Sequence, residues 1–295
     1  MIHVGTCSWT EKSLIKSGEW YPKTVRTAES RLHYYASHFD TVEVDSTFYA
    51  IPSKQNAYLW AQRAPEGFIF HIKVYGVMTG HAVDPRSLPP DIRNELPAQD
   101  RERKYVYVKQ PELLRAIFER FMDSLYPLAS TGKLGVFVFQ FPPWFSYKEK
   151  HLEYILSCKQ HIGRNAIAVE FRHGSWYLAE AQEKVFRFLR ENGIIHVVVD
   201  EPQLGTLATV PFVPQTTADI AYYRLHGRNK ENWLKKNVET SLRYAYLYSD
   251  KELEVFVPHI QISAKAATET YVMFNNCHGS YAMRNAEKMK TLASQ

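Results

Sequence analysis

Charged, amide and thiol side chains recur near the end of almost every strand that the sequence predicts. They are Cys7, Glu43, Asp45, His71, Lys73, Gln140, Glu170, Arg172, Asp200, Arg224, His226, Asn275 and Asn276. Side chains two residues apart on a strand point the same way, so pairs such as Glu43 and Asp45 are predicted to share a face. A core that needed only stability would use Val, Ile and Leu there. The pattern therefore predicts a functional site.

Three of these residues are candidate catalytic groups. Glu43 and Glu170 have the side chain of a general acid or base, and His226 that of a proton carrier. Two inward carboxylates on one strand repel each other unless a cation or a metal lies nearby. Salt bridges inside the mouth of a barrel, or a hydrogen-bonded structural histidine, are the structural alternatives.

The remaining candidates are predicted to bind substrate. Arginine offers a planar fork for carboxylate or phosphate, and a loop tryptophan suits stacking on a base or a sugar ring. An exposed Trp176 is expected beside Arg172, and the Asn pair precedes a helix whose amino end could bind phosphate. The predicted substrate-binding residues are Asp45, His71, Lys73, Gln140, Arg172, His173, Trp176, Arg224, Asn275 and Asn276.

The charges at these positions favour a metal-free site. The inward carboxylates are Glu43, Asp45, Glu170 and Asp200, and the inward cations Lys73, Arg172 and Arg224 nearly cancel them. A strong divalent-metal site needs an excess of carboxylate and histidine without adjacent cations. No cofactor is therefore predicted, and a divalent metal held by Glu170, Asp200 and His226 is the alternative.

Bulk properties narrow the class of protein. The chain has 295 residues, a net charge of +5 and 45% hydrophobic residues, enough for a large core. Its mild basicity permits an anionic partner, nucleic acid included, without requiring one. Three widely spaced cysteines without a CxxC motif favour a reducing cytoplasm. No apolar run approaches 18 residues, so no membrane span is expected.

Short apolar runs alternate with segments of helical period along the whole chain. The predicted strands are Ile2–Trp9, Thr41–Phe48, Phe68–Tyr75, Lys133–Phe141, Ala166–Arg172, Ile194–Asp200, Ile220–His226 and Thr270–Asn276. Seven helices are predicted near Ala28–Phe39, Gln55–Ala64, Pro111–Leu128, Lys148–His161, Ala179–Glu191, Asp250–Ala266 and Ala282–Leu292.

This alternation predicts an α/β fold, a (β/α)8 TIM-like barrel forming one domain over residues 1–295. A doubly wound sheet is the main alternative, but the GxGxxG that would favour it is absent. The pattern breaks after the third strand. Residues 76–110 are rich in Pro, Asp and Arg, which is typical of a lid or a disordered insert.

Six segments together resemble one known family. They are GTCSW, FDTVEVDSTFYAIPS, QFPPWF, VEFRHGSW, YRLHG and FNNCHGSYAMRNA, and their order and spacing are similar to those of the YecE-like family, domain of unknown function 72. The resemblance covers essentially the whole chain and implies a TIM-like barrel, but no established activity. A distant likeness of such barrels to metal-dependent sugar isomerases and apurinic endonucleases suggests DNA binding only by analogy.

The resemblance carries over to pocket positions alone. The family's strand-end acids match Glu43 and Glu170, its basic positions match Arg172, His173, Arg224 and His226, and its amides match Asn275 and Asn276. This chain departs from the family at Cys7, where many relatives have Ser or Gly, which argues against a nucleophile there. It also has a longer segment at about 85–109, which leaves substrate size open.

Three functions compete. The first is an enzyme, of hydrolase or isomerase/lyase type, that acts on a phosphorylated or nucleic-acid substrate at the carboxyl ends of the strands. The second is a nucleic-acid-binding protein without catalysis, using Arg101, Arg103, Lys104 and Lys109 with Trp144 and Trp176. The third is a small-molecule-binding scaffold whose polar ring is a neutralised salt-bridge network.

Overall fold

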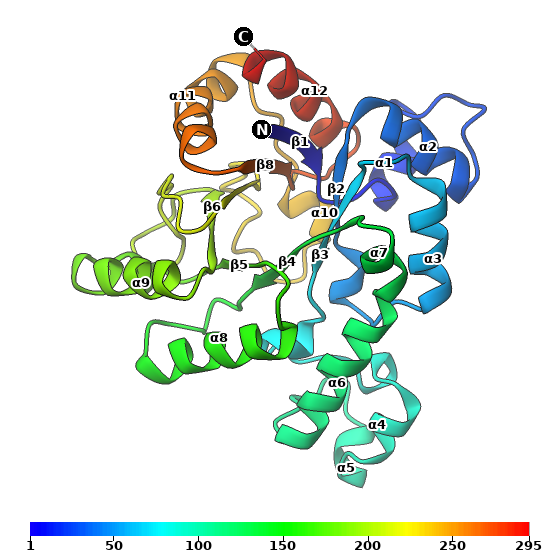
Figure 1. Ribbon diagram of the computed structural model, residues 1–295, viewed down its shortest axis with the longest axis vertical. Helices are drawn as coiled ribbons and strands as arrows, with labels where there is room; N and C mark the ends of the chain where they lie inside the picture. Colours follow the sequence, from blue (N-terminus) through cyan, green and yellow to red (C-terminus); the bar gives the residue numbers. More distant parts are fainter. Residues whose placement is uncertain (295) are drawn as a thin grey trace.

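Eight parallel strands form one sheet that curls into a nearly closed barrel, with helices around its outside (Figure 1). The computed structural model describes residues 1–294. The strands are β1 (Ile2–Thr6), β2 (Thr41–Val44), β3 (Ile69–Lys73), β4 (Leu134–Gln140), β5 (Ile167–Glu170), β6 (Ile195–Asp200), β7 (Ile220–Leu225) and β8 (Glu269–Phe274). Their order, β1-β8-β7-β6-β5-β4-β3-β2, confirms the predicted TIM-like barrel.

All seven predicted helices are present, with boundaries that differ by a few residues. They are α2 (Ala28–His38), α3 (Lys54–Arg63), α6 (Pro111–Ser124), α8 (Glu149–Ile162), α9 (Ala179–Glu191), α11 (Asp250–Ala266) and α12 (Tyr281–Ala293). Capping boxes fix two of the starts, Thr27 with Ser30 for α2 and Ser249 with Glu252 for α11. The structure adds the short helices α1 (Lys12–Ser17), α4 (Pro90–Asn94), α5 (Ala98–Arg101), α7 (Tyr126–Ser130) and α10 (Thr240–Arg243).

The barrel closes between β1 and β2, where no strand ladder is formed within residues 1–294. The Tyr35 hydroxyl bridges the two strands instead: it accepts from the Thr6 amide at 2.9 Å and donates to the Thr41 carbonyl at 3.0 Å. Gly5 allows this approach, because a Cβ there would lie 2.5 Å from the Thr41 oxygen. A buried tyrosine therefore satisfies backbone groups that a ladder would otherwise pair.

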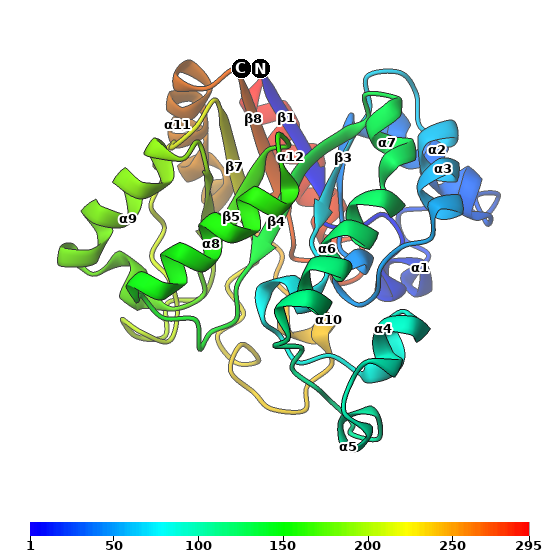
Figure 2. The ribbon, with the colours of Figure 1, turned by 60° about the horizontal axis from the view of Figure 1, so that its bottom comes forward.

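The carboxyl ends of the strands face away from both termini. Figure 2 shows the termini beside the start of β1, while α4, α5 and α10 lie beyond the opposite end of the barrel. The connections that follow the carboxyl ends of the strands include the 3-10 turns η1 (Ser46–Phe48), η2 (Gly76–Thr79), η3 (Pro85–Ser87) and η4 (Gly174–Tyr177). These connections build the mouth of the barrel.

The insert after β3 is packed against the body rather than left as a structureless loop. Val83 and Val106 form an antiparallel bridge with N–O distances of 3.0 and 2.8 Å. Val77, Leu88 and Ile92 are buried in the main core. Because short turns and scattered apolar anchors hold the segment, it shows none of the periodicity by which a longer helix is predicted.

No helix within residues 1–294 is both long enough and apolar enough to cross a membrane.

Candidate functional site

A cavity of about 510 Å³ lies at the mouth of the barrel, beside the ends of β1, β2 and β8. Asp45, Glu11 and Glu239 contribute carboxylates, and Lys12 contributes a cation. The other lining residues supply hydroxyls, phenols, an amide and thiols: Ser8, Thr10, Ser46, Thr240, Ser241, Tyr49, Tyr244, Asn275, Cys7 and Cys277. Polar groups placed around such a wall can orient a small molecule.

Arg224, beneath this cavity, is fully buried and has its donors occupied. Its Nε and Nη2 donate to the two oxygens of Glu43 at 3.1 and 2.7 Å. Its Nη1 donates to Glu170 and, at 3.3 Å, to Gln140, while Nη2 lies 3.5 Å from Asp45. A guanidinium so surrounded cannot also clamp a substrate anion without losing these partners. Arg224 therefore organises the site from below.

Glu43 is a carboxylate that changes its charge near neutral pH. It is fully buried, and the Tyr222 hydroxyl donates to it at 2.9 Å. Burial raises the pKa of Glu43 to about 7, partly opposed by Arg224 and reinforced by the Asp45 charge. Glu43 can thus gain or lose a proton near neutral pH, as an acid–base group must.

Glu170 shares Arg224 with Glu43 but behaves in the opposite way. Burial opposes its ionisation, yet the charges of Arg224 and Arg172 and the hydrogen bond from His226 outweigh that effect and hold the pKa of Glu170 well below its usual value. All its neighbours donate to it, His226 Nε2 at 3.0 Å and Arg172 Nη1 at 3.1 Å among them. Glu170 is therefore a fixed anion.

His226 is neutral in this arrangement. Burial lowers the pKa of His226 to about 4, although Glu170 favours the proton. Its Nδ1 accepts from the Asn275 amide at 2.8 Å, so the remaining proton sits on Nε2 and is donated to Glu170. Asn275, which also lines the cavity, thereby fixes the tautomer.

Lys73 and Asp45 form the part of the ion network nearest to solvent. Lys73 Nζ lies 3.3 Å from Asp45 Oδ1, and their side chains are 12% and 27% exposed. The ammonium also lies 4.8 Å from the centre of the Phe48 ring. Burial lowers the pKa of Lys73, but Asp45, Tyr244 and Glu43 together outweigh this and leave the pKa above the usual value. The lysine is a fixed cation beside a carboxylate that faces the cavity.

Besides Glu170, Arg172 forms an ion pair with Glu201, an acid that the sequence analysis does not single out. Arg172 Nη2 lies 3.2 Å from Glu201 Oε2, and the Val210 amide donates to Glu201 Oε1 at 2.8 Å. Burial raises the pKa of Glu201 to about 7, with Arg172 opposing. Glu201 follows Asp200 directly and precedes a proline, so its position reads as a turn. Tyr222 was also missed, although it shares a period of two with Arg224 and His226.

His71 lies below the mouth, inside the barrel. Its Nδ1 accepts from the Val136 amide at 2.9 Å, and its ring packs against Tyr271 with centroids 4.2 Å apart. Burial lowers the pKa of His71 to about 3. The structure therefore separates His71 from the cavity, although the alternation on β3 correctly predicts that it points inward.

The expectation of an exposed Trp176 is wrong. Trp176 is fully buried, its indole donates to the Phe145 carbonyl at 2.6 Å, and its ring stacks on Phe171 with centroids 4.2 Å apart. The apolar ring gains more from this packing than from water. His173 beside it caps η4, accepting from the Ser175 amide at 3.2 Å. Neither side chain lines the cavity at the mouth.

The side chains of Asp200 and Asn276 do not line the cavity and form hydrogen bonds elsewhere. Asp200 accepts a bidentate pair of bonds from Arg228 and a 2.6 Å bond from the Tyr248 hydroxyl. Asn276 donates to the Tyr246 carbonyl and to Asn285. Asp200 therefore does not converge with Glu170 and His226. Within residues 1–294 no group of three or more His, Cys, Asp or Glu side chains is arranged to hold a metal.

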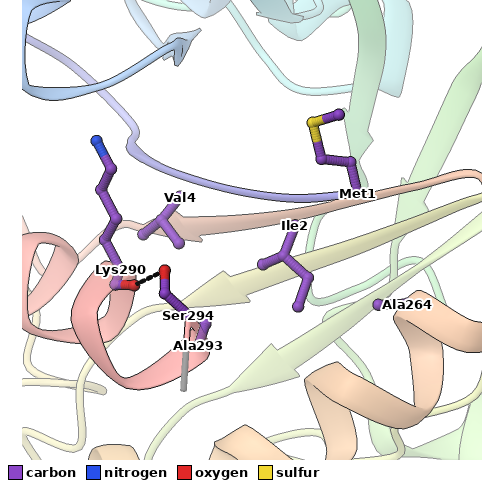
Figure 3. A pocket seen from close by; sticks show the side chains of 7 residues that line it. All are labelled: Met1, Ile2, Val4, Ala264, Lys290, Ala293 and Ser294. Atoms are coloured by element: carbon purple, nitrogen blue, oxygen red, sulfur yellow. Dashed lines mark hydrogen bonds between the residues drawn. The ribbon is translucent and has the colours of Figure 1, made fainter.

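Another cavity, of about 420 Å³, lies at the opposite end of the barrel. Figure 3 shows its lining: Met1, Ile2, Val4, Ala264, Lys290, Ala293 and Ser294. Only Lys290 among these carries a charged side chain, and its ammonium donates to the His38 carbonyl at 2.7 Å. The groups that could do chemistry gather at the mouth instead.

Known proteins are similar to this chain in both sequence and fold. The sequence model of the family described as "Protein of unknown function DUF72" matches residues 3–295. The chain belongs to the DUF72 family. The UPF0759 protein YunF of Bacillus subtilis is 33% identical over 99% of this chain and 94% of its own length. The UPF0759 protein YecE of Escherichia coli is 23% identical over 68% of this chain and 59% of its own length.

Crystal structures of DUF72 proteins have the same architecture. One from Thermotoga maritima is 32% identical, with a TM-score of 0.79 over the full length of both chains. One from Enterococcus faecalis is 28% identical, with a TM-score of 0.80 over 100% of this chain and 96% of its own. These matches confirm the resemblance to the YecE-like family. None of the descriptions names a substrate or a reaction.

Proposed function

We propose that this DUF72 protein is an enzyme that moves protons on a small anionic molecule bound at the mouth of the barrel. Isomerases, lyases and hydrolases share this chemistry. The observation that carries the proposal is Glu43, a buried carboxylate of pKa about 7, directly behind the cavity-facing Asp45. A perturbed acid beneath a polar cavity is typical of catalytic sites.

We assign a role to each side chain from its exposure to the cavity and from the partners that it already has. Asp45 is the carboxylate that contacts substrate, and Glu43 adjusts the charge behind it through Arg224, which touches both. Lys73 has three donors and a single ion-pair partner, so it can bind an anionic group. Arg172, which pairs with Glu170 and Glu201, adds a second positive charge to this subsite. Glu170, Arg224 and His226 position these groups.

A test combines a probe anion with single substitutions. Inorganic phosphate is titrated by calorimetry into the wild-type protein, Lys73→Met and Lys150→Met. Lys150 is exposed on α8 and serves as the matched loss of charge. Because charge-assisted hydrogen bonds are worth about 1.5–3 kcal/mol, we expect Lys73→Met to weaken binding about ten- to a hundredfold and Lys150→Met to leave it unchanged.

Catalysis is tested by screening small phosphorylated and carboxylated compounds for turnover. We expect Asp45→Asn to abolish any turnover that the wild-type protein and Lys150→Met both show. Equal phosphate binding in all three calorimetry samples would refute the anion subsite, and full turnover by Asp45→Asn would refute the catalytic role.

The nucleic-acid alternative has weaker support. Trp176 is buried, Arg101 donates to the Leu96 and Asn94 carbonyls, and Arg103 pairs with Asp100 at 3.1 Å. Trp144, 54% exposed, is the remaining aromatic candidate. Binding to DNA or RNA at low salt that weakens steeply with added salt would revive it.

A further inference from the structure

Residues 227–249, here called the gate loop, form a long connection closed on itself. The Gly227 amide donates to the Tyr248 hydroxyl at 2.7 Å, so the two ends of the loop meet. The Asn229 side chain donates to the Leu242 and Ala245 carbonyls, both at 3.0 Å. The loop therefore has the internal ties of a compact surface loop.

The base of the gate loop is fixed, whereas its outer part has few anchors. Arg228 and Tyr248 both bond to Asp200, which holds the base on β6. Between positions 229 and 245, Trp233 and Ser241 are the buried residues, 3% and 7% exposed. A segment held by so few side chains opens more easily than the body it covers.

Trp233 covers the ion network. Its ring lies 5.1 Å from the Arg172 guanidinium carbon and 6.1 Å from the His226 ring. Tyr244, from the same loop, lies 5.8 Å from His226 and also lines the cavity. The indole thus occupies the face of Arg172, a charged group that an anion would otherwise approach.

We propose that Trp233 is the latch of a gate, and that the anionic group of the substrate replaces its indole on Arg172 when residues 229–245 swing outward. The ligand half of this inference rests on the proposed function, whereas the latch itself does not. In the closed state the indole keeps water from this face of the network, which strengthens the charge interactions within it.

Hydrogen–deuterium exchange tests the latch without any ligand. Trp233→Ala removes it, and Leu234→Ala, at an exposed neighbour in the same loop, is the matched control. We expect amides of residues 229–245 to exchange about tenfold faster in Trp233→Ala, the factor that corresponds to a partly desolvated cation–π contact. Strands β7 and β8 and the control should match the wild-type protein.

Two outcomes would overturn the latch. Unchanged exchange in Trp233→Ala means that the indole does not hold the loop. Acceleration that spreads through β7 and β8 means that Trp233 is an ordinary core residue whose loss loosens the barrel.

The same measurement with saturating inorganic phosphate tests the ligand half. We expect phosphate to speed exchange of residues 229–245 in the wild-type protein and to have no effect in Arg172→Met. Phosphate that binds by calorimetry without speeding exchange contradicts replacement of the indole. Absence of phosphate binding contradicts the proposed function and the ligand half together, while the exchange in Trp233→Ala still decides the latch.

Discussion

The two ends of the barrel handle charge in different ways. At the amino end, His3 lies between Asp40 and Glu269, at 2.6 and 2.9 Å, and both acids are more than a third exposed. At the mouth, Glu43, Glu170 and Arg224 are fully buried and pair only with one another and their neighbours. Solvent screens the first cluster and is excluded from the second.

This difference separates stability from function. Exposed pairs cost little to form and contribute little, whereas each buried ion carries a desolvation cost of several kcal/mol that its partners must offset. Apolar residues of similar volume would often give an equally stable core. The buried network at the mouth has a high desolvation cost and lies beside a cavity. A role in catalysis therefore explains it better than a contribution to stability does.

The largest expected effect comes from removing the centre of the network. Arg224→Met leaves Glu43 and Glu170 buried without their shared cation, so we expect a loss of about 3–5 kcal/mol in the free energy of unfolding. Urea denaturation at pH 7 measures it. Arg187→Met, at an exposed arginine 2.6 Å from Glu183, should cost well under 1 kcal/mol. If the two variants lose equal stability, the mouth and the surface do not differ as claimed.

The second effect is a pH dependence that belongs to Glu43. Its pKa of about 7 lies above the ordinary 4.5, so folding favours the protonated form. Its contribution to stability is complete below pH 4.5 and is lost as the pH rises through 7. The side chain of Glu43→Gln cannot ionise. We therefore expect the free energy of unfolding of this variant, relative to that of the wild-type protein, to rise by an amount on the order of 3 kcal/mol as the pH rises from 4.5 through 7.

Unfolding curves measured from pH 4.5 to 8 give that difference directly. A constant offset between Glu43→Gln and the wild-type protein would mean that Glu43 ionises normally despite its burial. The part proposed for Glu43, adjusting the charge behind Asp45, would then have no support from its titration.

The barrel was predictable because each strand is a short apolar run between turn signals. The convergence of Glu43, Glu170, Arg224 and His226 was predictable too, since parallel strands finish at one end of a barrel. Their chemical roles stay predictions. Several predicted strands end early: Asp45 has helical backbone angles and Arg172 follows β5, yet both still reach the network.

Burial and long-range contacts were the features that the sequence could not supply. Trp176 reads as an exposed loop residue, because nothing local reveals that Phe145 and Phe171 stack on it. Glu201 and Trp233 both contact Arg172 but are 29 and 61 positions away from it in the printed sequence. No periodicity links residues that meet only through tertiary structure.

The smallest expected effect tests the amino end. The hydrogen bond to Asp40, partly opposed by burial, raises the pKa of His3 above 6.5, with Glu269 adding to the shift. The contribution of His3 to stability is therefore complete below pH 6.5 and is lost as the pH rises through the raised pKa.

At pH 6, His3→Gln should lower the free energy of unfolding by less than about 1 kcal/mol, because solvent screens both acids. The cost should shrink further in 1 M salt, where the Debye length is about 3 Å. A cost as large as that of Arg224→Met, unaffected by salt and pH, would show that both ends of the barrel depend on buried charge and would remove the contrast on which the functional argument rests.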